Sequence, residues 1–182
     1  MERLLGGRVV RVWPLKQATE YAGREGCAII SISGDGDPRA DLKRGWGDVL
    51  RLEFIDDSPR GIFNLAIALD KSSKLTDDKV EELEGFMRHC ATQSQMELAL
   101  KFALYHKENR NDDLHIHCGA GISRSLAMGI CIADYFRWPI WAKAFEGEPP
   151  PDRMGNPHVR KLMQRAIRER EERRQGSQRI VT

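Results

Sequence analysis

The sequence lacks the features that would place the chain in a membrane. No apolar run approaches the roughly 18 residues that a membrane span needs, and the stretch from Met1 to Gly7 lacks the apolar core of a signal peptide. The net charge is only +2, with 29 Lys and Arg against 27 Asp and Glu, so no strong overall field attracts polyanions. We therefore expect no membrane partner, and we do not expect nucleic acid as a partner.

Cysteine is scarce and scattered. The four cysteines stand at positions 27, 90, 118 and 131, and no two have the close spacing of zinc ligands. His115, His117 and Cys118 are neighbours, but no second pair of ligands follows, so we predict no metal and no cofactor. Cys27 and Cys131 lie in apolar segments and are interpreted as buried thiols. Unpaired cysteines fit a reducing, cytoplasmic location.

One short segment, residues 117–125, contains a histidine, a cysteine, two glycines, two serines and an arginine. An apolar strand pattern precedes it at 114–116, and an apolar helix pattern follows at 126–136. Between a strand and a helix, the backbone N–H groups of the turn and the helix dipole form a cradle for a phosphate-sized anion. Gly119 and Gly121 are expected to permit positive φ and close approach of the backbone to an oxyanion.

Two side chains of this segment can act on a bound phosphate. Arg124 offers a planar donor fork for two phosphate oxygens, and the local positive field should favour the thiolate form of Cys118. A charged nucleophile aimed at phosphorus predicts a phosphatase; the alternative is a structural cysteine on a glycine turn. The predicted phosphate-binding residues are Gly119, Ala120, Gly121, Ile122, Ser123 and Arg124.

The pattern His-Cys-x5-Arg-Ser resembles the signature of the cysteine-based protein tyrosine and dual-specificity phosphatases, and the chain is most similar to their small single-domain bacterial and phage members. The resemblance implies that Cys118 attacks phosphorus and forms a phosphocysteine, which water hydrolyses. It implies that Arg124 binds the phosphate and the transition state, that Ser125 assists departure of the thiolate, and that His117 supports the loop. The implied activity is metal-independent hydrolysis of phosphotyrosine, with phosphoserine and phosphothreonine left open, in a phosphorylated protein or peptide.

Two aspartates, Asp56 and Asp57, follow a strand expected over residues 49–55. Ligands of an open α/β sheet bind beyond the carboxyl ends of its strands, and a phosphatase needs a proton donor for the leaving oxygen. The resemblance puts this general acid at Asp56, whereas Asp57, before Ser58 and a proline, suits the fixing of a turn. The alternative acids lie in the segment that follows: Asp70, Asp77 and Asp78.

The alternating patterns predict an α/β fold: a central, mostly parallel sheet of about four to five strands flanked by helices, like that of the tyrosine phosphatases. We expect one phosphatase domain over residues 1–175 and a flexible tail over 176–182. Residues 58–90 have no counterpart in the resemblance and are interpreted as an insertion, of which 60–75 are expected to form a loop or lid. Asn156 precedes Pro157 as a helix cap, and the resemblance adds a hydrogen bond from Asn156 to the cysteine loop region.

Two rival functions stay open. One is a phosphatase of an RNA 5′-phosphate, a sugar or a lipid, although a loop without lysine argues against highly charged inositol lipids. The other is a phosphate-binding module whose catalysis has decayed, against which the joint presence of Cys118, Arg124 and Ser125 weighs. The sequence leaves the oligomeric state open.

Overall fold

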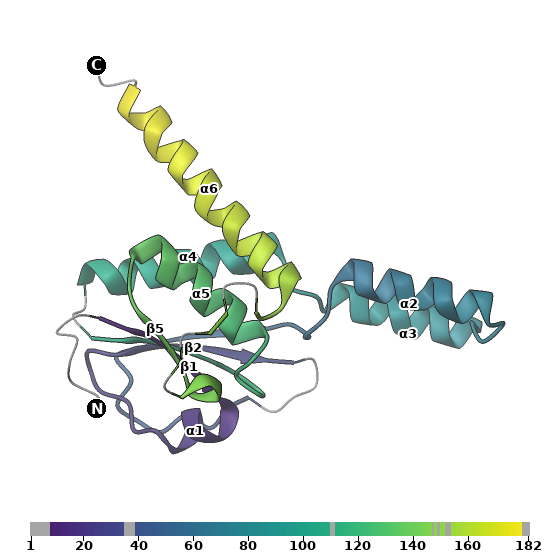
Figure 1. Cartoon of the computed structure of the whole chain (residues 1–182), viewed down its shortest axis with the longest axis horizontal. Coiled ribbons are helices and arrows are strands. Elements are labelled where there is room, and N and C mark those ends of the chain that lie inside the picture. Colours follow the sequence, from purple (N-terminus) through teal and green to yellow (C-terminus); the bar gives the residue numbers. More distant parts are fainter. Residues whose placement is uncertain are drawn as a thin grey trace.

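Five parallel strands form the centre of the computed structural model. The structure describes residues 8–34, 39–109, 112–146, 148, 150–151 and 154–179, and for residues 178 and 179 it describes the backbone alone. The strands lie in the order β3-β2-β4-β1-β5 (Figure 1). The predicted α/β fold with a parallel sheet is thereby confirmed. The strands are β1 (Val10–Pro14), β2 (Ala28–Ser33), β3 (Asp48–Glu53), β4 (Leu114–Cys118) and β5 (Ile140–Ala142).

One face of the sheet is apolar and lies under three long helices. Because side chains alternate between the two faces of a strand, residues such as Ile30, Ile32 and Ile116 all point toward this layer and are buried in one core with it. Figure 1 shows the helices together on this side of the sheet. They are α4 (Gln93–Asn109), α5 (Arg124–Phe136) and α6 (Pro157–Arg179).

The opposite face of the sheet carries a cluster of aromatic rings and the short helix α1 (Leu15–Glu20). The His115 ring stacks on Trp13 with 5.9 Å between ring centroids, and Trp46 meets the His115 edge at 4.9 Å. Tyr21 and Trp141 also contact Trp13. The two faces therefore differ in chemistry, and only the apolar face has a deep helical cover.

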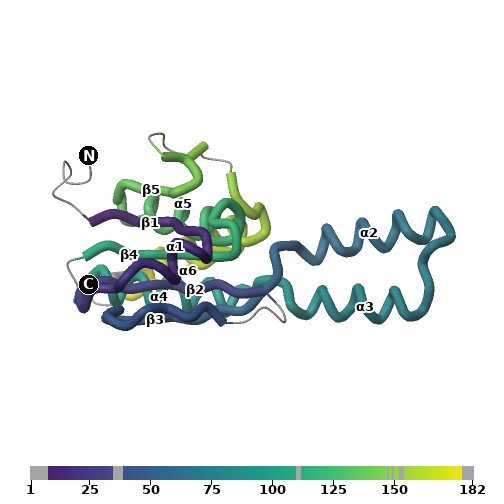
Figure 2. The backbone as a smooth tube through the Cα atoms, turned by 90° about the horizontal axis from the view of Figure 1, so that it is seen from below, coloured from purple at the N-terminus to yellow at the C-terminus, as the bar shows by residue number. Residues whose placement is uncertain are grey.

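Residues 59–88 form two helices that lie side by side and project from the body as an arm (Figure 2). They are α2 (Pro59–Lys71) and α3 (Asp77–Arg88). The prediction of a loop or lid over 60–75 was wrong, because α2 occupies most of that range. Ser58 caps α2 by accepting a hydrogen bond from the Gly61 N–H at 3.0 Å, and Pro59 begins it.

The sequence pattern also missed a short strand after α5. The strand β5 follows Trp138 and Pro139 and pairs with β1, with Val10 opposite Ile140. The helix α6 runs as far as Arg179, so part of the predicted tail is helical, and residues 180–182 lie outside the described residues. Within the described part of the chain, no helix is both long and apolar enough to cross a membrane.

Candidate active site

The loop from Gly119 to Ser123 connects the end of β4 to the start of α5 at the carboxyl edge of the sheet. Cys118 is the last residue of β4, paired in register with Pro14, the last residue of β1, and its side chain is buried. Ser123 is the N-cap of α5, and Arg124 is the first helical residue. The strand–loop–helix arrangement that the sequence predicted around Cys118 is thus present.

Ser125 lies against the cysteine. Its Oγ is 3.0 Å from Cys118 Sγ, and both side chains are buried. Because Ser125 belongs to the first turn of α5, its position is fixed by the helix rather than by a mobile loop. A hydroxyl at this distance can donate to a thiolate, so Ser125 can stabilise negative charge on Cys118.

Arg124 is held by one edge of its guanidinium group. Its Nη1 donates to the Phe54 carbonyl oxygen at 2.7 Å, and the residue is only 8% exposed. Its Nε is buried and has no hydrogen-bond partner among the described residues. The Nη2 lies beside Gly119, since a Cβ built there would sit 3.7 Å from it. The Nε–Nη2 edge is therefore directed at the loop and available to an oxyanion.

The backbone of the loop also offers donors. None of the backbone hydrogen bonds of the described residues is donated by an N–H group of residues 119–123. Gly121 has φ +74°, and a Cβ there would lie 2.6 Å from the Pro14 nitrogen, so only glycine fits. Of the two glycines that permit positive φ, Gly121 alone uses it within the loop. Successive unpaired N–H groups form a concave anion-binding nest.

His117 precedes Cys118 on β4 and bonds to the neighbouring strand β2. Its Nε2 is 2.8 Å from the Ser31 Oγ on the neighbouring strand, in a buried setting. Burial lowers the pKa of His117 to about 4, partly opposed by a hydrogen bond with the Cys118 backbone and reinforced by the charges of Arg51 and Arg124. His117 is therefore neutral near pH 7 and anchors the end of β4 to β2.

Asp56 joins the loop to two distant segments. Its Oδ1 accepts hydrogen bonds from Ser123 Oγ at 2.6 Å and from Asn156 Nδ2 at 2.8 Å. The Asp56 side chain is exposed, and its Oδ2 has no hydrogen-bond partner among the described residues. One carboxylate oxygen is thus fixed at the rim of the loop while the other is open to a ligand.

Asn156 combines both of its predicted roles. Its Oδ1 caps α6 by accepting from the N–H groups of His158 and Val159 at 2.9 and 3.0 Å. The backbone N–H of Asn156 donates to the Ser123 carbonyl oxygen at 3.2 Å, and this bond connects Asn156 to the cysteine loop. Gly155, at φ +85°, permits this close packing, because a Cβ there would lie 2.6 Å from the backbone nitrogen of Ala127.

Asp57 points away from this network. Its Oδ1 accepts from the Ser58 N–H at 2.7 Å, at the entry to α2. This contact is that of a turn-forming aspartate. Asp70, Asp77 and Asp78 belong to the arm: Asp70 lies in α2, and the other two lie in the first turn of α3.

Cys27 and Cys131 lie apart from the cysteine loop in the chain. Burial raises the pKa of Cys131 to about 11, and burial also raises the pKa of Cys27. Both thiols are buried, as predicted. No group of three or more His, Cys, Asp or Glu side chains among the described residues could hold a metal ion.

Sequence reasoning missed the partners that orient the site. Ser31, the Phe54 carbonyl and the Ser123 hydroxyl each hold a predicted residue in place, across 86, 70 and 67 residues of chain respectively. Only the tertiary fold brings such partners together.

Comparison of the chain with family models, with curated proteins and with solved structures gives no match.

Proposed function

We propose that this protein is a cysteine-dependent phosphatase of the tyrosine and dual-specificity kind, which hydrolyses phosphotyrosine in proteins or peptides without a metal. One observation carries the proposal: Cys118 Sγ lies at the base of a loop whose backbone N–H groups and Arg124 Nε have no acceptor among the described residues. A dianionic phosphoryl group supplies acceptors of the right number and charge.

In the first step the Cys118 thiolate attacks phosphorus. The S–P bond forms as the bond from phosphorus to the leaving oxygen breaks, and that oxygen takes a proton from Asp56. The Asp56 carboxyl is suited to this role because Oδ1 is held by Ser123 and Asn156 while Oδ2 is open. The products are the free alcohol or phenol and a phosphocysteine.

In the second step water attacks the phosphocysteine. Asp56, now a carboxylate, accepts a proton from the water, the S–P bond breaks, and Cys118 departs as a thiolate while phosphate leaves. Ser125 Oγ, 3.0 Å from Sγ, donates a hydrogen bond to the departing sulfur. In both steps the loop N–H groups and Arg124 stabilise the charge that develops on the equatorial phosphoryl oxygens.

The rim of the loop bears on substrate choice. Gly119, Ala120 and Ile122 are all exposed, whereas Cys118 itself is buried. The sequence contains no motif that recognises the ring of a phosphotyrosine. We therefore include phosphoserine and phosphothreonine among the proposed substrates.

The assay that tests the proposal uses phosphotyrosyl and phosphothreonyl peptides, an RNA 5′-phosphate, a sugar phosphate and a phosphoinositide, all in EDTA. We expect the wild type to hydrolyse the peptides and Cys118→Ser to lose at least about 10³-fold in turnover while it still binds tungstate. Cys131→Ser, which alters another buried thiol, is the matched control and should stay active.

Other outcomes of this assay assign other functions. Hydrolysis of only a non-protein phosphomonoester would keep the mechanism and replace the substrate. Tungstate binding without turnover of any compound would indicate a phosphate-binding module. Residual hydrolysis by Cys118→Ser within about tenfold of the wild type would contradict the nucleophile.

A further inference from the structure

The arm exposes an apolar stripe on α2. Phe63 is 59% exposed and Ile67 is 38% exposed, and residues four apart lie on the same face of a helix. The side of α2 that packs on α3 is a different one, formed by Ile62 together with the half-buried Ala66 and Leu69. The stripe is thus not used within the chain's own arm.

Two opposite charges border the stripe at helical spacing. Arg60 lies three residues before Phe63, and Asp70 lies three residues after Ile67; both are exposed. Residues 60, 63, 67 and 70 therefore line one side of α2 with a cation at one end and an anion at the other.

This order is self-complementary. When two copies of α2 lie antiparallel about a two-fold axis at residue 65, Phe63 of each copy faces Ile67 of the other. The same axis brings Arg60 of each copy opposite Asp70 of the other, because both pairs are centred on residue 65. A two-fold contact uses every favourable pair twice. We propose that the α2 stripe is the contact surface of a homodimer in which two arms pair antiparallel.

The position of the arm makes this contact accessible. Figures 1 and 2 show α2 and α3 extending away from the sheet and its covering helices, so that two bodies can stand at opposite ends of the paired arms. The helix has 13 residues, which is about 20 Å of length. Such a contact is small beside the about 800 Å² per partner of a standard interface, so we expect a reversible dimer.

A different face of α2 supplies a matched control. Leu65 is 49% exposed, but it stands two residues from both Phe63 and Ile67 and so lies on the other side of the helix. An exposed leucine removed from the same helix tests whether loss of any apolar side chain, rather than loss of the stripe, changes association.

Sedimentation equilibrium over about 1–100 μM, the range expected of a small interface, tests the proposal on the full chain. We expect the wild type to dimerise, and Phe63→Glu, Arg60→Glu and Asp70→Arg each to weaken the dimer by at least about tenfold. The double variant Arg60→Glu with Asp70→Arg should regain the dimer because it exchanges the two charges. Leu65→Glu should dimerise like the wild type.

Three results would overturn the dimer. One is a wild type that stays monomeric over this range, which would leave the stripe to a different protein. The second is a charge-exchanged double variant no better than the single variants. The third is a Leu65→Glu variant as impaired as Phe63→Glu. Circular dichroism of each variant establishes that α2 is folded. The proposal is independent of the phosphatase assignment, since none of these residues lies at the cysteine loop.

Discussion

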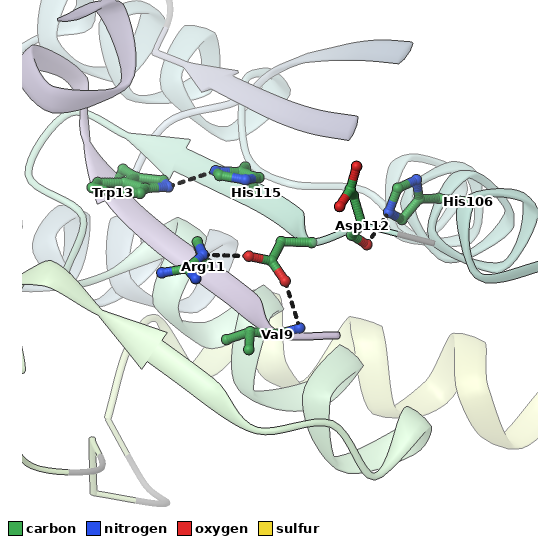
Figure 3. Close-up of polar contacts among 7 residues, drawn as sticks. Val9, Arg11, Trp13, His106, Asp112 and His115 are labelled. Carbon is green, nitrogen blue, oxygen red and sulfur yellow. Dashed lines mark hydrogen bonds and ion pairs between the residues drawn. The ribbon is translucent and has the colours of Figure 1, made fainter. Parts of the chain in front are cut away.

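The polar groups at the two ends of β4 differ in whether they have hydrogen-bond partners within the chain. At the amino end, the Asp113 carboxylate accepts hydrogen bonds from the Val9 N–H at 2.9 Å and from Arg11 Nε at 2.5 Å, and His106 Nε2 lies 2.9 Å from the Asp112 carbonyl (Figure 3). At the carboxyl end, the loop N–H groups and Arg124 Nε lack acceptors among the described residues.

One strand thus carries polar groups that bond to each other at one end and polar groups without partners at the other. The buried Nε of Arg124 is a donor without a partner among the described residues, which costs free energy unless a ligand satisfies it. At the amino end, the Asp113 carboxylate and His106 Nε2 find their partners within the chain. At the carboxyl end, the loop N–H groups and Arg124 Nε have no acceptor among the described residues, as expected of a binding site for an anion.

The largest expected effect comes from exchanging the charged group at each end. Arg124→Lys should lower kcat/KM by about 10²–10³-fold, because an ammonium cannot both bond the Phe54 carbonyl and present a planar edge to phosphate. Asp113→Asn should instead lower the free energy of unfolding and leave kcat/KM near that of the wild type. Steady-state kinetics gives kcat/KM, and urea unfolding gives the free energy of unfolding, for both variants. Similar losses of kcat/KM in the two variants would contradict the proposed difference between the two ends of β4.

The next effect distinguishes the two aspartates. Asp56→Ala should slow hydrolysis of a tyrosyl phosphate by about 10²-fold and slow an activated aryl phosphate much less, because a good leaving group needs no proton. Asp57→Ala should be mild with both substrates, since its carboxylate bonds the Ser58 N–H. If Asp57→Ala is the selective variant, the roles are exchanged; if both are mild, neither aspartate is the general acid.

A smaller effect concerns the two glycines of the loop. Gly121→Ala should lower both stability and phosphate affinity, because its Cβ would meet the β1 backbone at 2.6 Å and its φ is +74°. Gly119→Ala should be tolerated, because its Cβ would make only an ordinary contact at 3.7 Å. Thermal unfolding with and without tungstate compares them, and equal losses would contradict the geometry of the loop.

The smallest effect is a pH dependence shared by two histidines of β4. Burial lowers the pKa of His115 to about 3 and that of His117 to about 4, from 6.5. Below about pH 6.5 the two histidines become protonated in the unfolded chain while they stay neutral in the folded chain. Stability should therefore be full above pH 6.5 and decrease toward pH 4.

Urea unfolding between pH 7 and pH 5 measures this decrease, and His115→Gln should make it shallower. Glutamine keeps an acceptor for Trp13 Nε1, which donates to His115 Nδ1 at 2.9 Å (Figure 3). A slope unchanged in both His115→Gln and His117→Gln would show that other groups govern the acid response.

The strand–loop–helix unit was predictable because its information is local. Alternation and apolar runs locate β2, β3, β4 and α5, and Asn156 with Pro157 marks the start of α6. The helix α2 was missed because Phe63, Leu65 and Ile67 are exposed, which blurs the periodicity that a buried face would produce. The strand β5 has only three residues, too few for a pattern.

Asp56 lies with Ser123 and Asn156, and Cys118 lies with Ser125, but this arrangement could not be read from the sequence. Asp56, Ser123 and Asn156 meet only because β3, β4 and α6 present their ends at one edge of the fold. The backbone angle of Gly119 depends on how the loop leaves β4, which composition does not determine.

Capture of a phosphocysteine tests the central claim most directly. Ser125→Ala should slow departure of the thiolate, so mixing it with a radiolabelled phosphotyrosyl peptide and quenching in acid should trap the intermediate. We predict a burst of about one phosphoryl group per chain, mapped to Cys118, followed by slow turnover, and no label in Cys118→Ser. Turnover by the wild type with no label trapped in either protein, or label on another residue, would contradict the account.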